Sequence, residues 1–191
     1  MRKVILALLA LAMCAVLAGC AVTVPTGSYI PQNYVRYDNP TNIDIAPFVY
    51  IPLVEGKVKL ANQIRNTAAG SIHISSDVAE FVRRVNALEF EKTGIQLSDK
   101  SKIRVSGEIV EFYIDDLGYS ATVHYSVKYI IKDSASDKVL YSRIFTPEPL
   151  KAGKFGTAAE GVQIINGPIA TAYDMFIKEQ EVTALLNAGR K

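Results

Sequence analysis

The sequence has very little cysteine, very little histidine and no tryptophan. Its two cysteines, Cys14 and Cys20, both lie close to the N-terminus. Cys14 falls in a segment that we expect to be removed, and Cys20 falls at the expected cleavage point. The folded part of the chain then has no thiol for a disulfide, a thiolate nucleophile or a metal site. Its stability must come from an apolar core.

An excess of one charge is also missing. The chain has 21 Lys and Arg against 19 Asp and Glu. Arg2 and Lys3 account for the difference, because no acidic residue accompanies them in the N-terminal segment. Without that segment the chain is formally neutral and exerts no long-range attraction on nucleic acid. We therefore predict no nucleic-acid binding.

The N-terminus has the three parts of a secretory signal peptide. Arg2 and Lys3 precede an apolar run from Val4 to Leu17, and small residues follow. A transmembrane anchor would need about 20 apolar residues. This run is shorter and ends without flanking charges, so we interpret residues 1–19 as a cleaved signal peptide.

The residues Leu17-Ala18-Gly19-Cys20 resemble the cleavage motif of bacterial lipoproteins. This resemblance implies cleavage between Gly19 and Cys20, a diacylated Cys20 side chain and an acylated new amino group, with fatty acids such as palmitate. Several acyl chains would hold the protein on the membrane permanently. Ala21, in place of Asp, implies sorting to the outer membrane with the body facing the periplasm.

The rest of the chain predicts a tether followed by one domain. Residues 20–41 show no sustained helical or strand periodicity and contain three prolines, so we predict a lipidated N-terminus and flexible tether there. Its tyrosines could pack on the domain or lie at the lipid interface. Residues 42–191 suit a single periplasmic domain in length.

The first half of this domain predicts short strands and one clear helix. Residues 43–53 favour an irregular edge strand, because Pro47 and Pro52 each lack an amide donor. Residues 59–66 are ambiguous and residues 71–74 read as a short strand. A helix should run over residues 77–93, with Asp77 and Glu80 at capping-box spacing and Gly94 after its end.

The second half predicts a three-strand meander and a long helix. In residues 103–114 the apolar parity changes, which indicates a bulge near Val110 or burial on both faces. Apolar and polar residues alternate strictly over residues 121–131, which predicts an antiparallel strand with one face toward water. Residues 139–145 should form the strand that runs back beside it. From Thr157 an apolar stripe continues through Gly167-Pro168, which favours one kinked helix over two separate helices. We predict an α+β fold, an antiparallel meander with two helices packed on one face.

Residue patterns for catalysis are weak. His73 and His124 lack clustered partners, and Asp115-Asp116 matches turn chemistry better than a catalytic pair. Residues 153–156 lack the full spacing of a phosphate loop. Tyr125 and Tyr129 could line a lipid groove, but core packing is the favoured interpretation. We predict no catalytic residue, no cofactor and no metal.

The order of parts resembles the YajG-like outer-membrane lipoproteins and, more distantly, auxiliary lipoproteins of ABC-type transporters. The likeness covers residues 72–186, including Asp77-Val-Ala-Glu-Phe-Val, Ile103-Arg-Val-Ser-Gly-Glu-Ile-Val and Tyr125-Ser-Val-Lys-Tyr. It implies a non-enzymatic envelope protein that docks to a transport or assembly complex. The region around Phe48 and the 147–156 loop are the expected surfaces. The alternatives left open are a homo-oligomer and an envelope hydrolase acting on wall or lipid.

Overall fold

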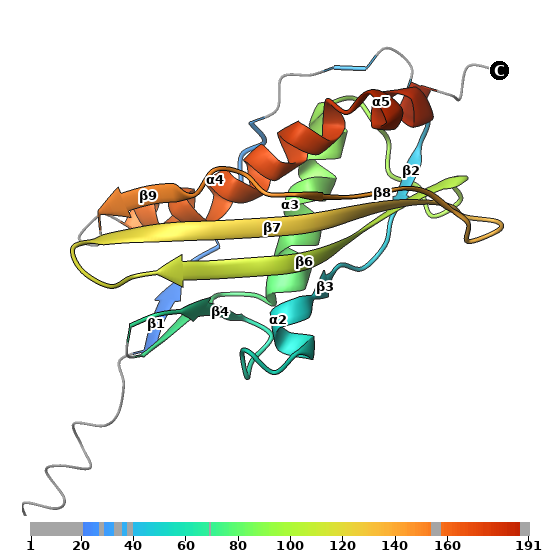
Figure 1. The fold of residues 1–191 in the computed structure, drawn as a ribbon. Coiled ribbons are helices and arrows are strands. Elements are labelled where there is room, and N and C mark those ends of the chain that lie inside the picture. Colours follow the sequence, from blue (N-terminus) through green and yellow to red (C-terminus); the bar gives the residue numbers. More distant parts are fainter. Residues whose placement is uncertain are drawn as a thin grey trace, which may run out of the picture.

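The computed structural model describes residues 21–26, 29–32, 36–37, 40–68, 70–153 and 158–187, with only the backbone for residues 158–160 (Figure 1). The predicted signal peptide and Cys20 therefore lie outside the described residues. The elements, in chain order, are β1 (Ala21–Val24), β2 (Ile43–Ile45), β3 (Val49–Tyr50), α2 (Ile51–Val54), β4 (Gln63–Asn66), β5 (Ser71–Ile74), α3 (Val78–Lys92), β6 (Ile103–Asp115), β7 (Ser120–Asp133), β8 (Val139–Phe145), β9 (Leu150–Gly153), α4 (Ala158–Ile177) and α5 (Gln180–Asn187).

The fold is α+β, as predicted, but its sheet is mixed. Strands β6, β7 and β8 form the expected antiparallel meander. On the other side of β6, however, β2, β3 and β4 pair with it in parallel, and β5 and β1 extend the sheet beyond β4. The sheet is therefore mixed, and the predicted antiparallel meander is one part of it. Parallel pairing needs a long crossover, and α3 lies in the one between β4 and β6.

The long strands carry the irregularities that their sequences indicate. The pairing of β6 with β7 shifts register between Ile109 and Glu111, so the predicted bulge at Val110 is confirmed. In β7 the alternating residues are buried, and Tyr125, Val127 and Tyr129 are at most 1% exposed. The strict alternation follows from one face packing on helices and the other facing water.

Helix α3 matches its predicted range closely. Asp77 is the N-cap residue, Thr93 ends the helix, and Gly94 follows in the left-handed region with a φ of 91°. On its apolar face Val78, Phe81, Val82 and Val85 are 0% exposed, and Leu88 is partly buried. The expected capping-box hydrogen bond is absent, since the Asp77 side chain makes no capping bond. Glu80 instead accepts a hydrogen bond from Nε of Arg83 at 2.8 Å.

Helix α4 is continuous through Pro168, which confirms the prediction of one helix over two separate helices. Helices α3 and α4 lie behind β6 and β7 in Figure 1, on the same face of the sheet. Their contacts with the sheet and with each other are aromatic. Phe176 stacks on Tyr129 with ring centroids 4.2 Å apart, and Tyr173 meets Phe90 edge-on at 5.0 Å. Burying each such ring contributes about 1.5–3 kcal/mol.

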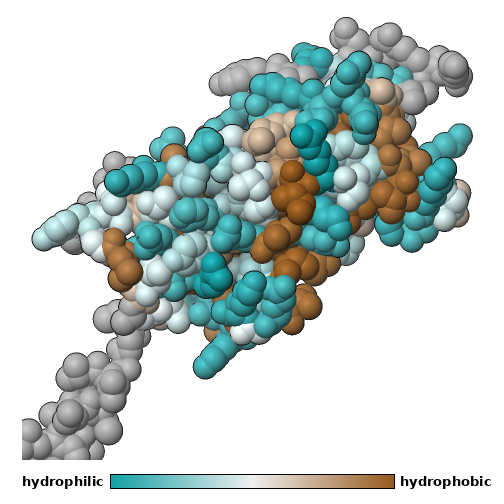
Figure 2. Space-filling model, in the orientation of Figure 1, coloured by the Kyte–Doolittle hydropathy of each residue, from teal (hydrophilic) through white to brown (hydrophobic). Residues whose placement is uncertain are grey.

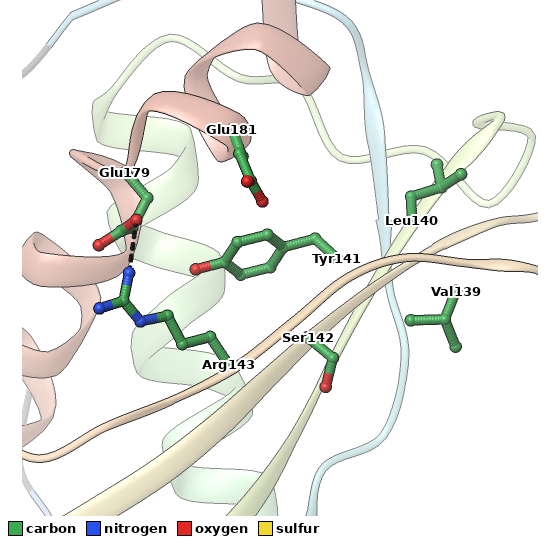
Figure 3. A pocket seen from close by; sticks show the side chains of 7 residues that line it. All are labelled: Val139, Leu140, Tyr141, Ser142, Arg143, Glu179 and Glu181. Atoms are coloured by element: carbon green, nitrogen blue, oxygen red, sulfur yellow. Dashed lines mark ion pairs between the residues drawn. The ribbon is translucent and has the colours of Figure 1, made fainter.

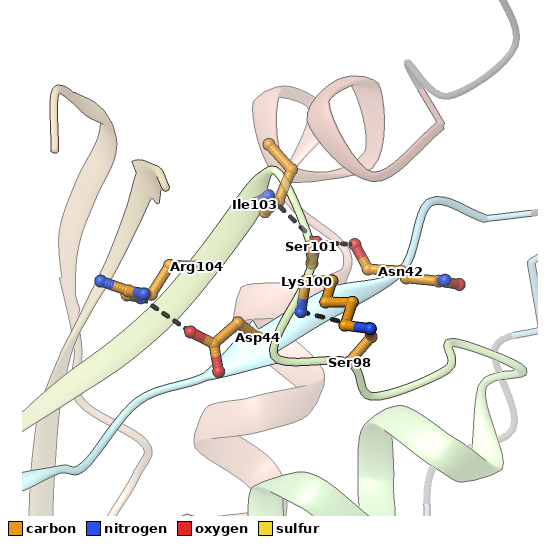
Figure 4. A network of polar contacts seen from close by, with 7 residues as sticks. All are labelled: Asn42, Asp44, Ser98, Lys100, Ser101, Ile103 and Arg104. Carbon is orange, nitrogen blue, oxygen red and sulfur yellow. Dashed lines mark hydrogen bonds and ion pairs between the residues drawn. The ribbon is translucent and has the colours of Figure 1, made fainter. Parts of the chain in front are cut away.

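Polar contacts fasten the start of the domain to β6 (Figure 4). The Arg104 Nε donates to the Asp44 carboxylate at 2.7 Å. The Ser101 hydroxyl donates to the Asn42 carbonyl at 2.5 Å and accepts from the Ile103 amide at 3.0 Å. These bonds hold β2 in register beside the first residues of β6.

The described part of the predicted tether packs on the domain. Ala21–Val24 pair in parallel with β5, and the Thr26 amide donates to Oγ of Ser75 at 3.0 Å. Tyr29 and Tyr37 are each 8% exposed, so these two tyrosines pack on the domain. The expectation of a flexible coil is therefore wrong for these residues. Prolines break periodic patterns, but they do not prevent an irregular segment from docking.

Candidate functional site

Of the residues predicted for cleavage, lipidation and sorting, Ala21 alone lies in the described part of the chain. Gly19 and Cys20 fall outside it, so cleavage and acylation stay predictions. Ala21, the predicted sorting residue, opens β1 opposite Ser71 and is exposed. Within the described ranges, no helix combines the length and the apolar character needed to cross a bilayer.

The adjacent carboxylates Asp115 and Asp116 organise a turn, as predicted. Asp116 accepts hydrogen bonds from the amides of Ala68 at 2.7 Å and Thr67 at 3.1 Å. Asp115 accepts one from the Thr67 hydroxyl at 2.8 Å. Partial burial opposes ionisation of Asp116, but the hydrogen bonds from Ala68, Asn66 and Thr67 prevail and lower its pKa below the usual value. The pair therefore joins the β6–β7 turn to the end of β4.

The two histidines lie apart and have ordinary structural surroundings. His73 Nδ1 lies 3.4 Å from Oδ1 of Asn62, and the His124 ring lies 5.6 Å from the Tyr113 ring, centroid to centroid. Among the residues that the structure describes, no three His, Cys, Asp or Glu side chains gather as metal ligands would.

The tyrosines of β7 belong to the core and not to a groove. Tyr125 and Tyr129 are 1% and 0% exposed, and burial raises the pKa of both hydroxyls. The Tyr129 hydroxyl donates to Oδ1 of Asn86 at 2.6 Å, which satisfies both buried groups. The favoured core interpretation is confirmed.

The two surfaces expected from the sequence are not simple exposed loops. Phe48 is only 6% exposed and occupies the space that a side chain on Gly107 would fill, since a Cβ there would lie 2.4 Å from its ring. Residues 150–153 of the expected 147–156 loop form β9, which pairs with the start of β7. Residues 154–156 lie outside the described ranges.

The candidate site that the structure does present lies along β8. A cavity of about 370 Å³ is lined by residues 139–143 of this strand and by two carboxylates from the α4–α5 region (Figure 3). The Arg143 guanidinium pairs with the Glu179 carboxylate at 2.8 Å. Tyr141 points from β8 toward Glu179 and Glu181, and burial followed by the charge of Glu179 raises the pKa of its hydroxyl.

The edge of the sheet beside this cavity is apolar and accessible. Strand β8 ends the described strand order and pairs only with β7 among the strands that the structure describes. Val139, Leu140 and Ile144 are 50%, 37% and 53% exposed. Figure 2 shows brown, hydrophobic side chains in the part of the view where Figure 1 places β8, whereas teal covers much of the remaining face. We call Val139, Leu140 and Ile144 the β8 edge patch.

Comparison with known proteins gives a fold but no family. No family model matches the chain, and no curated protein matches it. Among solved structures, a Xanthomonas campestris protein of family DUF330 superposes with a TM-score of 0.61 at 12% identity, covering 88% of this chain and 98% of that one. The two proteins share their fold.

Weaker similarities extend to proteins described as lipoproteins. A putative lipoprotein from Caulobacter crescentus gives a TM-score of 0.44 at 14% identity, covering 67% of this chain and 92% of that one. The PelC dodecamer from Paraburkholderia phytofirmans gives 0.40 at 11%, covering 75% and 93%. None of these three proteins is described as YajG-like, so the resemblance to that family is not confirmed.

Sequence reasoning found the strand β8 but missed its role as an edge. Residues 139–145 were expected to return beside β7, which they do. The available signal was the pair Val139-Leu140 followed by Ile144, which puts apolar residues on both parities of one strand. A strand with one wet face should be apolar on one parity only, so this pattern marks a second apolar surface.

Proposed function

We propose that this protein is a non-enzymatic lipoprotein, anchored through Cys20 to the periplasmic face of the outer membrane, and that it binds an envelope protein. The binding surface is the β8 edge patch with the adjacent cavity. The partner belongs to a transport or assembly complex and contributes an extended, partly apolar segment. A second copy of this chain is the other occupant that the edge could accept.

The observation that carries the binding role is the accessible apolar edge. An edge strand presents unpaired backbone donors and acceptors, and natural proteins usually blunt it with charges, prolines or bulges. Here three of the seven residues of such a strand, Val139, Leu140 and Ile144, have exposed apolar side chains. Addition of a strand from a partner would satisfy the backbone and cover these side chains.

The charges beside the patch support recognition more than chemistry. Arg143 and Glu179 neutralise each other at 2.8 Å, and their side chains are 59% and 29% exposed. Glu181 adds a further negative charge at the cavity, so a partner segment carrying a basic side chain would be favoured.

The anchor is tested by mass spectrometry of the protein purified from membranes. We expect a chain that begins at Cys20 and carries both a diacylglyceryl group and an amide-linked fatty acid. Separation of inner and outer membranes should place it in the outer fraction, and Ala21→Asp should shift it to the inner one. A free thiol at Cys20 or an uncut leader would refute the anchor.

The binding surface is tested by photo-crosslinking in cells, with a crosslinking amino acid at Leu140. The matched control is Leu60, another exposed leucine (54%) in the segment between α2 and β4. We expect an adduct from Leu140 that Ile144→Lys abolishes, and none from Leu60. An adduct of doubled mass would identify a second copy as the occupant. Equal adducts from both positions, or no effect of Ile144→Lys, would refute the surface.

A further inference from the structure

The β6–β7 turn carries two exposed apolar side chains that the core does not explain. Tyr119 is 89% exposed and Leu117 is 66% exposed. The turn that holds them is anchored to the residues after β4, because Asp115 and Asp116 accept hydrogen bonds from Thr67 and Ala68. The two exposed side chains therefore lie on a turn whose backbone is held in place by hydrogen bonds.

The strand order places the expected lipid at this same end of the sheet. Strand β1 runs parallel to β5, β5 runs antiparallel to β4, and β4 runs parallel to β6. Strand β1 is thus antiparallel to β6, so the first residue of β1 lies at the end of the sheet where β6 ends. In Figure 1 the start of β1 and the β6–β7 turn both lie at the left-hand end.

The distances along and across the sheet are short enough for the β6–β7 turn and the predicted lipid site at Cys20 to reach the same membrane surface. The row of paired residues that includes Ala21 reaches β6 near Tyr113. Strand β6 ends two residues later at Asp115, about 7 Å further along at 3.3 Å per residue, and Leu117 lies in the turn just beyond. Three strand spacings separate β1 from β6, about 14 Å in total. Cys20 adjoins Ala21, and one peptide unit spans about 3.8 Å.

Sheet twist does not undo this arrangement. Neighbouring strands rotate by about 20–25°, so three steps turn the two strand directions apart by about 60–75°. Because that angle is below 90°, the start of β1 and the β6–β7 turn still lie on the same side of the domain. The β6–β7 turn extends further out on that side than the start of β1, where the lipid would be attached.

We propose that the β6–β7 turn is a membrane-contact site, and that Leu117 and Tyr119 enter the interface of the leaflet that holds the Cys20 lipid. This inference rests on the proposed lipidation. Tyrosine is favoured at membrane interfaces because its ring is apolar and its hydroxyl is wet. The contact orients the domain as well as holding it.

The orientation has a consequence for the β8 edge patch. Strand β7 leads away from the turn for 14 residues, about 45 Å at 3.3 Å per residue. Strand β8 pairs with the distant half of β7, from Val127 to Lys132. The patch is thereby held away from the bilayer, toward the periplasmic space where a protein partner is accessible.

The chain offers a clean test because it contains no tryptophan. Tyr119→Trp places a single fluorophore at the tip, and Leu117→Trp places one beside it. Ala135→Trp is the control, since Ala135 is an exposed residue in the β7–β8 turn at the opposite end. Each full-length variant is purified in its acylated form, checked by mass, and reconstituted into vesicles of phosphatidylethanolamine, phosphatidylglycerol and a brominated phosphatidylcholine.

We expect tryptophan at positions 119 and 117 to lose most of its fluorescence to the brominated lipid and to emit at shorter wavelength. Tryptophan at position 135 should keep its fluorescence. If Cys20 is acylated and position 119 is not quenched, or is quenched no more than position 135, the membrane-contact site is refuted and the lipoprotein proposal stands. If Cys20 is unmodified, both fail together.

Discussion

The helix-covered core and the described residues between positions 21 and 41 are held in place in different ways. The core uses interlocking aromatic rings, such as Phe176 on Tyr129. The N-terminal residues use strand pairing in β1 and individual hydrogen bonds to helices α3 and α4. The Tyr29 hydroxyl donates to the buried Glu89 carboxyl, and the Tyr37 hydroxyl donates to the Ile177 carbonyl at 2.8 Å. The difference teaches that apolar periodicity specifies the first region, whereas the second depends on polar partners far away in the sequence.

The largest effect is expected in the aromatic core. Phe176→Ala removes a ring that is 0% exposed and should lower the free energy of unfolding by about 3–5 kcal/mol. Urea denaturation followed by circular dichroism measures this loss. The control is Met175→Ala on the same helix, where the side chain is 40% exposed. Similar losses from both substitutions would contradict the helix-on-sheet packing.

A smaller effect is expected in the N-terminal segment. Tyr29→Phe removes the hydroxyl that donates to Glu89, although the Gln32 amide still donates to that carboxyl at 2.9 Å. Leaving a buried acceptor with fewer partners should cost about 1–3 kcal/mol. Burial, followed by the bond to Glu89, raises the pKa of the Tyr29 hydroxyl, so it stays protonated and able to donate.

Two further tyrosines sharpen this measurement of unfolding free energy. Tyr37→Phe removes a bond to a neutral carbonyl and should cost about 0.5–1.5 kcal/mol. Tyr119→Phe, at an 89% exposed position, should leave stability unchanged. If Tyr29→Phe behaved like Tyr119→Phe, residues 29–32 would not be docked as the structure has them.

A further small effect on stability concerns the β6–β7 turn and depends on pH. The pKa of Asp116 is lower in the folded chain than in the unfolded chain, where an aspartate titrates near about 3.9. Its stabilising contribution is therefore complete above about pH 4 and is lost as the pH falls through the lower folded value. Asp116→Asn should cost about 1 kcal/mol at pH 7.

Denaturation between pH 2 and pH 7 checks this sign. The difference between the parent protein and Asp116→Asn should shrink as the pH falls below about 4. Asp99→Asn, at an exposed aspartate, should give curves parallel to those of the parent. A difference between the parent and Asp116→Asn that is constant with pH would show that the carboxylate charge does not hold the turn.

Elements with a strong local pattern could be predicted from the sequence. The stripe of α3, the alternation of β7 and the parity change at Val110 each follow from which face meets the core. Pairings between segments that are distant in the sequence could not be predicted in this way. Nothing local in Ala21–Val24 shows that it joins β5, and nothing near Phe48 shows that Gly107 leaves room for its ring.

The candidate site divides in the same way. The motif that predicts a leader cleaved before Cys20 is a local pattern, so it could be recognised without a structure. The β8 edge patch could not, because an edge exists only when the order of the strands is known. The same holds for Leu117 and Tyr119, whose position beside the start of β1 follows from three successive strand pairings.

The sequence alone determined the motif that predicts lipid attachment, the helix and meander periodicity, and the absence of cysteine after position 20, because each is written in adjacent or regularly spaced residues. Only the tertiary structure decided that the sheet is mixed, that the N-terminal segment docks, and which edge and turn stay exposed. Those features depend on contacts between residues 40 or more positions apart, for example Tyr29 with Glu89. Their free energy comes from pairing and burial that no local pattern encodes.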